Sequence, residues 1–426
     1  MSTSAQAEIP NPNPQLPDPR GTSILRRLAA ALHYRDFRIL WFGALTSTIG
    51  TWMQEVALNW LIVTMTGAAS AFYLGLDTFL GETPILLFTL IGGVVADQRD
   101  RRQVLLASQY TQMGVAFALV ALVYFDVVQV WHVLALSVVT GVAQAFGGPA
   151  YQSLLPSLVE KDHVPNAIAL NSIQFNLARV IGPLLAGGAL AAFGMVACFG
   201  LNGLSFLAVI FAILSMHIRH VPSTTAVTMQ EQLKSGFRFV RGKPAIISLT
   251  VLAAATTFLG NPLLTFLPLF ARDVFHGDVG EYTRLMAFAG GGAVTGALVV
   301  AWLGRFKHMG LTLLLLQLTF GVLMTAFAQA HVFWLNALLL FAGGAAMVMT
   351  MAMLSSLVQL IAPNDMRGRV MSIYMVAFRG GMPIGSLVAG WIASITSAPF
   401  VLTLNGVLLS MVAAWFLLKS HGVREL

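Results

Sequence analysis

Charged residues are scarce in this sequence. Asp, Glu, Lys and Arg together make up 10% of its 426 residues, while hydrophobic residues make up 57% and the mean hydropathy is +0.79. This small number of polar side chains cannot cover the surface of a soluble domain. The composition therefore excludes a water-soluble globular protein. The net charge of +7 follows from topology, as described below, and we expect no nucleic-acid partner.

Cysteine is nearly absent, and the usual catalytic patterns are missing. Cys198 is the only cysteine, which excludes a disulfide within the chain. The sequence contains no H-E-x-x-H, no G-x-S-x-G, no Walker loop and no paired metal-ligand cluster. We therefore expect no enzyme activity, no metal and no cofactor. An ATP-driven pump would need a nucleotide-binding domain that this sequence does not contain.

Long uncharged runs are what the sequence has instead. The segments 182–218, 309–364 and 380–418 contain no Asp, Glu, Lys or Arg. A membrane-spanning helix needs about 20 apolar residues, so each run can hold two spans in whole or in part. Turn-forming residues divide the runs at Phe193-Gly194, Ala330-His331 and Ser397-Ala398-Pro399. With the shorter runs, the pattern predicts an all-α polytopic membrane protein with twelve transmembrane helices.

The basic residues predict how the chain is oriented. If the N-terminus is cytoplasmic and twelve spans alternate, 20 of the 24 Lys and Arg residues fall in cytoplasmic segments, as the positive-inside rule requires. We therefore expect a multi-pass protein of the cell (inner or plasma) membrane with both termini in the cytoplasm. The polar, proline-rich start of the chain predicts a disordered tail.

The longest cytoplasmic loop divides the chain into two halves. In this loop Met229, Leu233, Phe237 and Val240 recur at helical spacing beside basic residues, which predicts a short amphipathic helix on the membrane surface. A simple linker that adds inside-positive charge is the alternative. The expected organisation is a tail at 1–32, a six-helix half at 33–217, an amphipathic linker at 218–243, a six-helix half at 244–418 and a tail at 419–426.

An internal repeat relates the two halves. Three residues recur 200 positions later in the chain: Ser172, Arg179 and Pro183 as Ser372, Arg379 and Pro383. An arginine and a proline in register inside predicted spans indicate a duplicated six-helix unit with pseudo-symmetric halves. Asn261-Pro262 interrupts another span and predicts a bend that can serve gating. Glycine pairs such as Gly343-Gly344 predict close helix packing.

The densest group of charges lies in the stretch GGVVADQRDRRQVLL at 92–106. The positive-inside rule explains its arginines, but an acid contributes little to orientation, so Asp97 needs another role. The stretch resembles the loop signature G-x-L-A-D-R-x-G-R-[KR] of the major facilitator superfamily, with Gly93, Ala96, Asp97, Arg101 and Arg102 in place. It departs from that signature at Val95, Gln98 and Asp100.

Other segments extend the resemblance to about residues 33–418. GPLLAGG, with Gly182, Pro183 and Gly187, is similar to the exporter-associated pattern G-P-x-x-G-G. FRILWFGALTSTIG and NAIALNSIQFNLARVIGP resemble the transmembrane secretion effector branch, which includes enterobactin-type siderophore exporters. The resemblance implies the major facilitator fold, with two halves that alternate access to a central cavity. It also implies that the 92–106 loop packs against the helix containing Arg379 and holds one access state closed.

Five charged residues lie inside predicted spans: Glu55, Asp77, Glu82, Arg179 and Arg379. Each costs roughly 2.5–3.5 kcal/mol at mid-bilayer on insertion scales, so we expect each to face a cavity or a partner. The fold implied by the resemblance places Glu55 near Arg179. It places Asp77 or Glu82 near Arg379, and only one of these acids is expected to face it because five positions turn a helix by about 140°. Structural ion pairs between helices are the alternative to a functional role.

Glu55 is the residue that we favour for a functional role. Trp52, Glu55 and Asn59 share one face of the predicted span 39–65, which the resemblance places beside the central cavity. A carboxyl group there can exchange protons as the cavity opens to each side.

These features predict a secondary active transporter. We expect a monomer in the lipid bilayer that exports a small apolar or amphipathic compound, such as a drug, siderophore or metabolite, with protons as the coupling ion. An uptake permease is the alternative within transport. A membrane-embedded sensor or non-transporting partner protein is the alternative outside it.

Overall fold

The computed structural model describes residues 30–216, 237–363, 366–419 and 422–426. All regular elements in these ranges are helices. The long ones are α2 Arg35–Thr66, α3 Ser70–Gln98, α4 Arg101–Tyr124, α5 Val130–Leu154, α6 Val164–Ser215, α8 Pro244–Gly260, α11 Val279–Leu303, α12 Met309–Gln329, α13 Phe333–Ile361, α14 Arg367–Ile395 and α15 Ala398–Lys419.

Ten helical stretches in the described ranges are long and apolar enough to cross a bilayer. Two of them, Arg35–Gln98 with 64 residues and Lys161–Ser215 with 55, have more than twice the ~20 residues of one span, so each holds two crossings. A short turn at Gly67–Ala69 separates α2 from α3. Gly194 breaks α6 with a positive φ of 75°, which glycine adopts without strain. The prediction of twelve transmembrane helices is confirmed, and the second break lies at the predicted Phe193-Gly194 turn.

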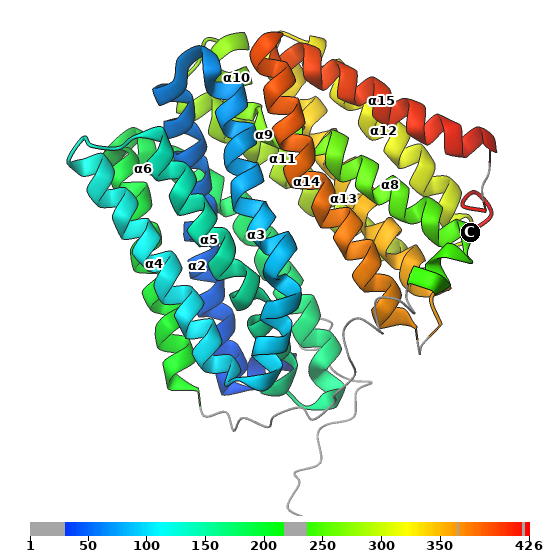
Figure 1. Cartoon of the computed structure of the whole chain (residues 1–426), viewed down its shortest axis with the longest axis horizontal. Coiled ribbons are helices and arrows are strands. Elements are labelled where there is room, and N and C mark those ends of the chain that lie inside the picture. The colour runs from blue at the N-terminus through cyan, green and yellow to red at the C-terminus, as the bar shows by residue number, and fades with distance from the viewer. Residues whose placement is uncertain (1–29, 217–236, 364–365, 420–421) are drawn as a thin grey trace, which may run out of the picture.

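The helices form two groups with internal packing of their own (Figure 1). In the N-terminal group, α2 packs on α6, α3 packs on α5, and α4 packs on both α5 and α6. In the C-terminal group, α11 and α12 pack on α13, α15 packs on α12, and α14 packs on α8. Between the groups, α3 contacts α14 and α6 contacts α11. The second crossing of each group thus meets the fifth crossing of the other, as expected of pseudo-symmetric halves.

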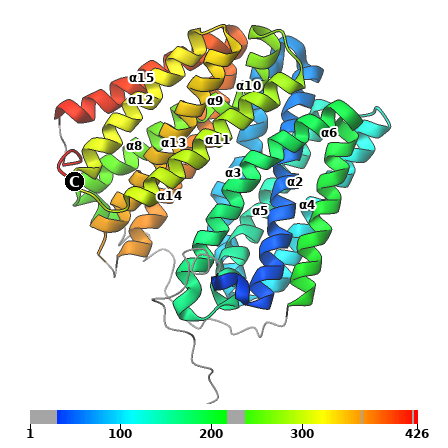
Figure 2. The same ribbon diagram turned by 180° about the vertical axis from the view of Figure 1, so that it is seen from behind.

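The two groups meet at one end of the molecule and diverge at the other (Figures 1 and 2). We call the end at Gly67–Ala69, where α2 passes into α3, the closed end, and the end at Arg99–Asp100, where α3 passes into α4, the open end. One hydrophobic cluster contains residues of both groups, including Leu61 and Phe266. Two further clusters lie toward the open end, one in each group. In the described residues, apolar packing therefore joins the groups at the closed end and leaves them separate at the open end.

The first crossing of the C-terminal group is broken at the predicted Asn261-Pro262 bend. α8 ends at Gly260, and the chain continues through the short α9 Pro262–Thr265 and α10 Leu267–Leu269 into a π-helical turn at Phe270–Val274. Side chains of neighbouring helices replace the lost backbone bonds. The Asn405 amide donates to the carbonyl oxygen of Leu259 at 3.1 Å. This is how a membrane helix tolerates proline.

Two predicted segments fall largely outside the described residues. These are most of the N-terminal tail 1–32 and most of the amphipathic linker 218–243, including Met229 and Leu233. The described end of the linker is helical from Phe237, which is exposed, to Arg241, and Val240 is buried.

A paired substitution in α13 tests the close packing of helices. A Cβ at Gly344 would collide with the carbonyl oxygen of Ala289 in α11, whereas a Cβ at the adjacent Gly343 meets no atom within 4 Å. We expect Gly344→Ala to lower the free energy of unfolding by about 1–3 kcal/mol and Gly343→Ala to melt like the wild type. Thermal unfolding in detergent compares them, and equal melting temperatures would contradict the packing.

Candidate functional site

An ion pair between α3 and α14 joins the two helix groups near the middle of their spans. The Oε2 atom of Glu82 lies 3.6 Å from Nη1 of Arg379, and both side chains are partly exposed. Asp77, about one and a half turns nearer the closed end, is buried and accepts a 2.5 Å hydrogen bond from the Ser137 hydroxyl of α5. Of the two acids that the sequence offered to Arg379, the structure brings Glu82 to it.

The expected ion pair between Glu55 and Arg179 does not form. Arg179 has no ion pair with any of the described residues, and its guanidinium lies over the indole ring of Trp52, 5.7 Å from the ring centroid. Gly182 lets α6 approach α2 closely, since a Cβ there would collide with Trp52. The indole therefore occupies the contact that the carboxylate was expected to make. The pairing prediction is wrong because sequence spacing does not show which side chain fills a helix contact.

Glu55 faces other carboxylates instead. Its side chain is accessible to solvent although protein surrounds it, and Asp77 and Glu82 act on it electrostatically. Three carboxylates in this region are thus accompanied by one paired arginine, Arg379. They are too dispersed for a metal site, since no group of three His, Cys, Asp or Glu side chains in the described ranges is arranged to hold a metal. An accessible carboxylate beside like charges is suited to accept a proton or a cation.

The polar face of α2 continues to a contact with the C-terminal group. Asn59 interacts with Glu55 on one side, and its amide donates a 3.3 Å hydrogen bond to the hydroxyl of Tyr282 in α11. Trp60 stacks on the same tyrosine, with ring centroids 6.3 Å apart and planes at 17°. Tyr282 is fully buried, and no sequence pattern distinguished it from other aromatic residues near span ends.

Arg272 joins the C-terminal group to the last turn of α2 at the closed end. Its Nη1 donates to the carbonyl oxygen of Val63 at 2.9 Å and to the Ser70 hydroxyl at 3.1 Å, and its Nη2 donates to the carbonyl oxygen of Gly67 at 3.2 Å. The last carbonyls of a helix lack intrahelical partners and carry negative partial charge, so a guanidinium satisfies them well. Arg272 also pairs with Asp273 at 2.6 Å. Sequence reasoning missed this contact because its partners lie more than 200 positions away.

The arginines of the 92–106 loop bind helix ends within the N-terminal group. Arg101 donates to the carbonyl oxygen of Ser153 at the end of α5 (3.2 Å), and Arg102 donates to that of Leu214 at the end of α6 (2.6 Å). Asp97 is exposed and pairs with Arg101, the residue one turn along, at 3.4 Å. The expected contact of this loop with the start of α14 is not made by Asp97 in this structure, in which the groups diverge at that end.

The glycines of the GPLLAGG segment act at helix contacts. Gly182 faces Trp52 of α2, and Gly187 faces Thr283 of α11, where an added Cβ would lie 2.5 Å from the threonine hydroxyl oxygen. Pro183 is buried between them. The segment therefore lets α6 approach a helix of each group. A Cβ added to Gly93 of the loop motif would have no atom within 4 Å, so packing does not require glycine there.

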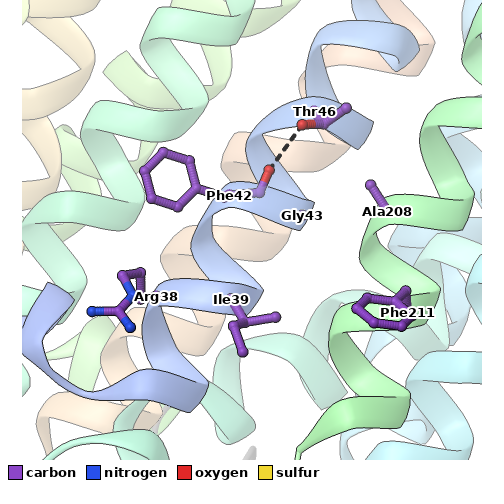
Figure 3. A pocket seen from close by; sticks show the side chains of 7 residues that line it. All are labelled: Arg38, Ile39, Phe42, Gly43, Thr46, Ala208 and Phe211. Carbon is purple, nitrogen blue, oxygen red and sulfur yellow. Dashed lines mark hydrogen bonds between the residues drawn. The ribbon is translucent and has the colours of Figure 1, made fainter.

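A shallow groove lies apart from these charged residues. It has a volume of about 430 Å³ and runs between α2 and the second crossing of α6 (Figure 3). Its lining residues are Arg38, Ile39, Phe42, Gly43, Thr46, Ala208 and Phe211. None of the predicted site residues lines it, and we assign no transport role to it.

Comparison with protein families and relatives agrees with this geometry. A model of the transmembrane secretion effector family matches residues 28–425. The chain is 28% identical over 398 residues to the multidrug efflux pump Tap of Mycolicibacterium fortuitum, covering 88% of this chain and 94% of that protein. It is 25% identical over 346 residues to the staphyloferrin A transporter of Staphylococcus aureus, covering 80% and 85%. It is 24% identical over 398 residues to the enterobactin exporter EntS of Shigella boydii, covering 92% and 94%.

Solved structures share the fold at low sequence identity. A bacterial homolog of the human lysosomal transporter Spinster, in an inward-facing and unoccupied conformation, superposes with a TM-score of 0.69 at 15% identity, covering 93% of this chain and 98% of that chain. The nucleoside transporter NupG superposes with a TM-score of 0.68 at 15% identity, covering 90% and 98%.

Substitutions at the α3–α14 ion pair test its assignment. We expect Arg379→Ala to lower the melting temperature in detergent, because it leaves Glu82 charged and unpaired. The loss should be about 1–3 kcal/mol, less than for a fully buried pair since both side chains are partly exposed. Adding Glu82→Gln to Arg379→Ala should recover part of this loss, and adding Asp77→Asn should not. If Asp77→Asn restores stability in the Arg379→Ala background and Glu82→Gln does not, the assigned pairing is wrong.

Proposed function

The chain belongs to the transmembrane secretion effector family of the major facilitator superfamily, and we propose that it is a secondary active exporter of a small apolar or amphipathic compound. The observation that carries this proposal is the set of charged residues held mid-span between two helix groups that are joined at one end. A solute that passes between the groups meets Glu55 and Arg179 on the way. The names of the Tap and EntS relatives, an efflux pump and an exporter, support the outward direction.

We place the open end in the cytoplasm. Basic residues gather there, with Arg99, Arg101 and Arg102 in the N-terminal group and Arg305 and Lys307 in the C-terminal group, and the positive-inside rule supports this orientation. Both termini are then cytoplasmic, and the structure corresponds to an inward-facing state. The moving units are the halves 33–217 and 244–418, with 218–243 as the linker between them.

Alternating access exchanges polar contacts at the two ends. To open outward, the molecule must break the bonds of Arg272 to the end of α2. To close its cytoplasmic end, the molecule brings the 92–106 loop to the start of α14, where Asp97 meets the positive end of a helix dipole. In the present state Asp97 pairs with Arg101 of its own helix group and does not contact α14.

Glu55 is the proposed coupling residue, with the proton as the coupling ion. It is accessible, it lies beside two other acids, and Asn59 links it to Tyr282 across the group boundary. Proton uptake relieves repulsion among the carboxylates, and the Asn59 contact connects that event to the closed end.

A flux measurement decides between the proposal and its alternatives. An efflux screen of a strain that lacks the protein, against drugs, siderophores and lipids, identifies a substrate. In inside-out vesicles an exporter accumulates that substrate when a proton gradient is imposed. An uptake permease drives it out instead, and a sensor or non-transporting partner gives no energised flux.

Two substitutions at opposite ends should shift the conformational equilibrium in opposite directions. Arg272→Gln removes the cap on α2 and should favour outward opening, whereas Asp97→Asn removes the inward-closing contact and should favour the present state. Each shift should be about 5–150-fold, corresponding to about 1–3 kcal/mol. Spin labels across the closed end measure the populations. Arg284→Gln is the control, because Arg284 pairs with Glu281 of its own helix. Unchanged label distances and normal flux in both variants would refute this gating scheme.

Glu55→Gln should separate coupling from passage of the substrate. Without a titratable group at this position, uphill export should be abolished while downhill exchange continues. Proteoliposomes with and without a proton gradient distinguish these activities. Glu160→Gln, on an exposed loop, is the matched control. Full uphill export by Glu55→Gln would rule out the coupling role.

A further inference from the structure

Two arginines lie near the middle of described spans, and of these Arg179 lacks an anionic partner. The other, Arg379, pairs with Glu82. A charge inside a span is costly unless a partner or a water-filled cavity receives it, so the environment of Arg179 needs an explanation. Its counter-ion was expected to be Glu55, which makes no ion pair with it and instead lies within electrostatic reach of Asp77 and Glu82.

The guanidinium of Arg179 makes a cation–π contact and no hydrogen bond within the described ranges. Its Cζ atom lies 5.7 Å from the centroid of the Trp52 ring, within the range of a cation–π interaction. Arg179 donates no hydrogen bond to any described residue. The nitrogen atoms of Arg179 also keep solvent-accessible surface, unlike Nε of Arg102, which is buried without a partner. The donors of Arg179 are therefore both unpaired and accessible.

Aromatic side chains lie beside these donors. Phe175, one turn from Arg179 on α6, is half exposed and makes an edge contact with Trp52, with ring centroids 6.1 Å apart. The backbone of Arg179 lies against Gly290 of α11: a Cβ added to this glycine would lie 3.3 Å from the carbonyl oxygen of Arg179. The site therefore sits where α6 lies between α2 and the C-terminal group, on the path assigned to the solute.

We propose that Arg179, Trp52 and Phe175 form a binding site for an aromatic carboxylate group of the transported compound. A planar carboxylate accepts two parallel hydrogen bonds from a guanidinium, and an attached ring stacks on the neighbouring aromatic side chains. The substrate supplies the missing counter-ion. This inference rests on the proposed export function for its relevance, but the binding step can be measured without any flux.

Three probes that differ in charge test the site on the purified full-length chain: 1-naphthoate, 1-naphthalenemethanol and 1-naphthylmethylamine. Isothermal titration in detergent measures each affinity. We expect naphthoate to bind the wild type at least about tenfold more tightly than the alcohol, as a charge-assisted pair predicts, and the amine to bind most weakly. Naphthoate that fails to bind, or binds no more tightly than the alcohol, overturns the proposal.

Variants then locate the preference. Arg179→Gln should abolish the discrimination between acid and alcohol, and Arg179→Lys should keep part of it. Arg38→Gln, at an arginine of the shallow groove between α2 and α6, should leave it unchanged. Discrimination that persists in folded Arg179→Gln refutes the site. If Arg179→Gln does not fold, the ranking of the probes on wild type and Arg179→Lys decides. Naphthoate preference without energised flux would retain the site and reject the export function, and flux without the preference would do the reverse.

Discussion

The bilayer offers no water to a polar group, and this constraint underlies most of the structure. Backbone groups must be satisfied within helices, and each helix break needs donors and acceptors from neighbouring elements. Asn405 serves this purpose at the Asn261-Pro262 break, and Arg272 serves it at the end of α2. The same constraint forces mid-span charges to face one another or an accessible space between the helix groups. Arg272, which stabilises the end of α2, is thus also a residue that the proposed gating scheme uses.

The contrast between the two ends follows from how this constraint is met. At the closed end one apolar cluster runs through both helix groups, and polar contacts such as Asn59 to Tyr282 lie within it. At the open end each group keeps its own cluster, and the arginines of the 92–106 loop bind helix ends of their own group. Because packed clusters are preserved within each group, a rigid-body movement between states exchanges mainly contacts across the boundary.

The mid-span charges divide into two chemically different sites. Glu55, Asp77 and Glu82 form an acidic region with one arginine, Arg379, bound to it. Arg179 stands apart on an aromatic surface. An acidic site suits proton uptake, and an unpaired guanidinium suits an anion, so coupling and substrate recognition need not compete for the same residue. The wrong prediction of a pair between Glu55 and Arg179 would have merged the two.

The fold class, the number of crossings, the duplicated unit and the family could be predicted from the sequence, because hydrophobic run length, in-register residues and loop motifs are local signals. The sequence also identified the mid-span charges, since any charge in such a chain is conspicuous. Which of these charges meet depends on how the helices pack. Arg379 reaches Glu82 and not Asp77 because of the helix rotation, and Arg179 meets Trp52 because Gly182 brings α6 onto α2. The contacts of Arg272 and Tyr282 had no sequence signal, because they join residues more than 200 positions apart.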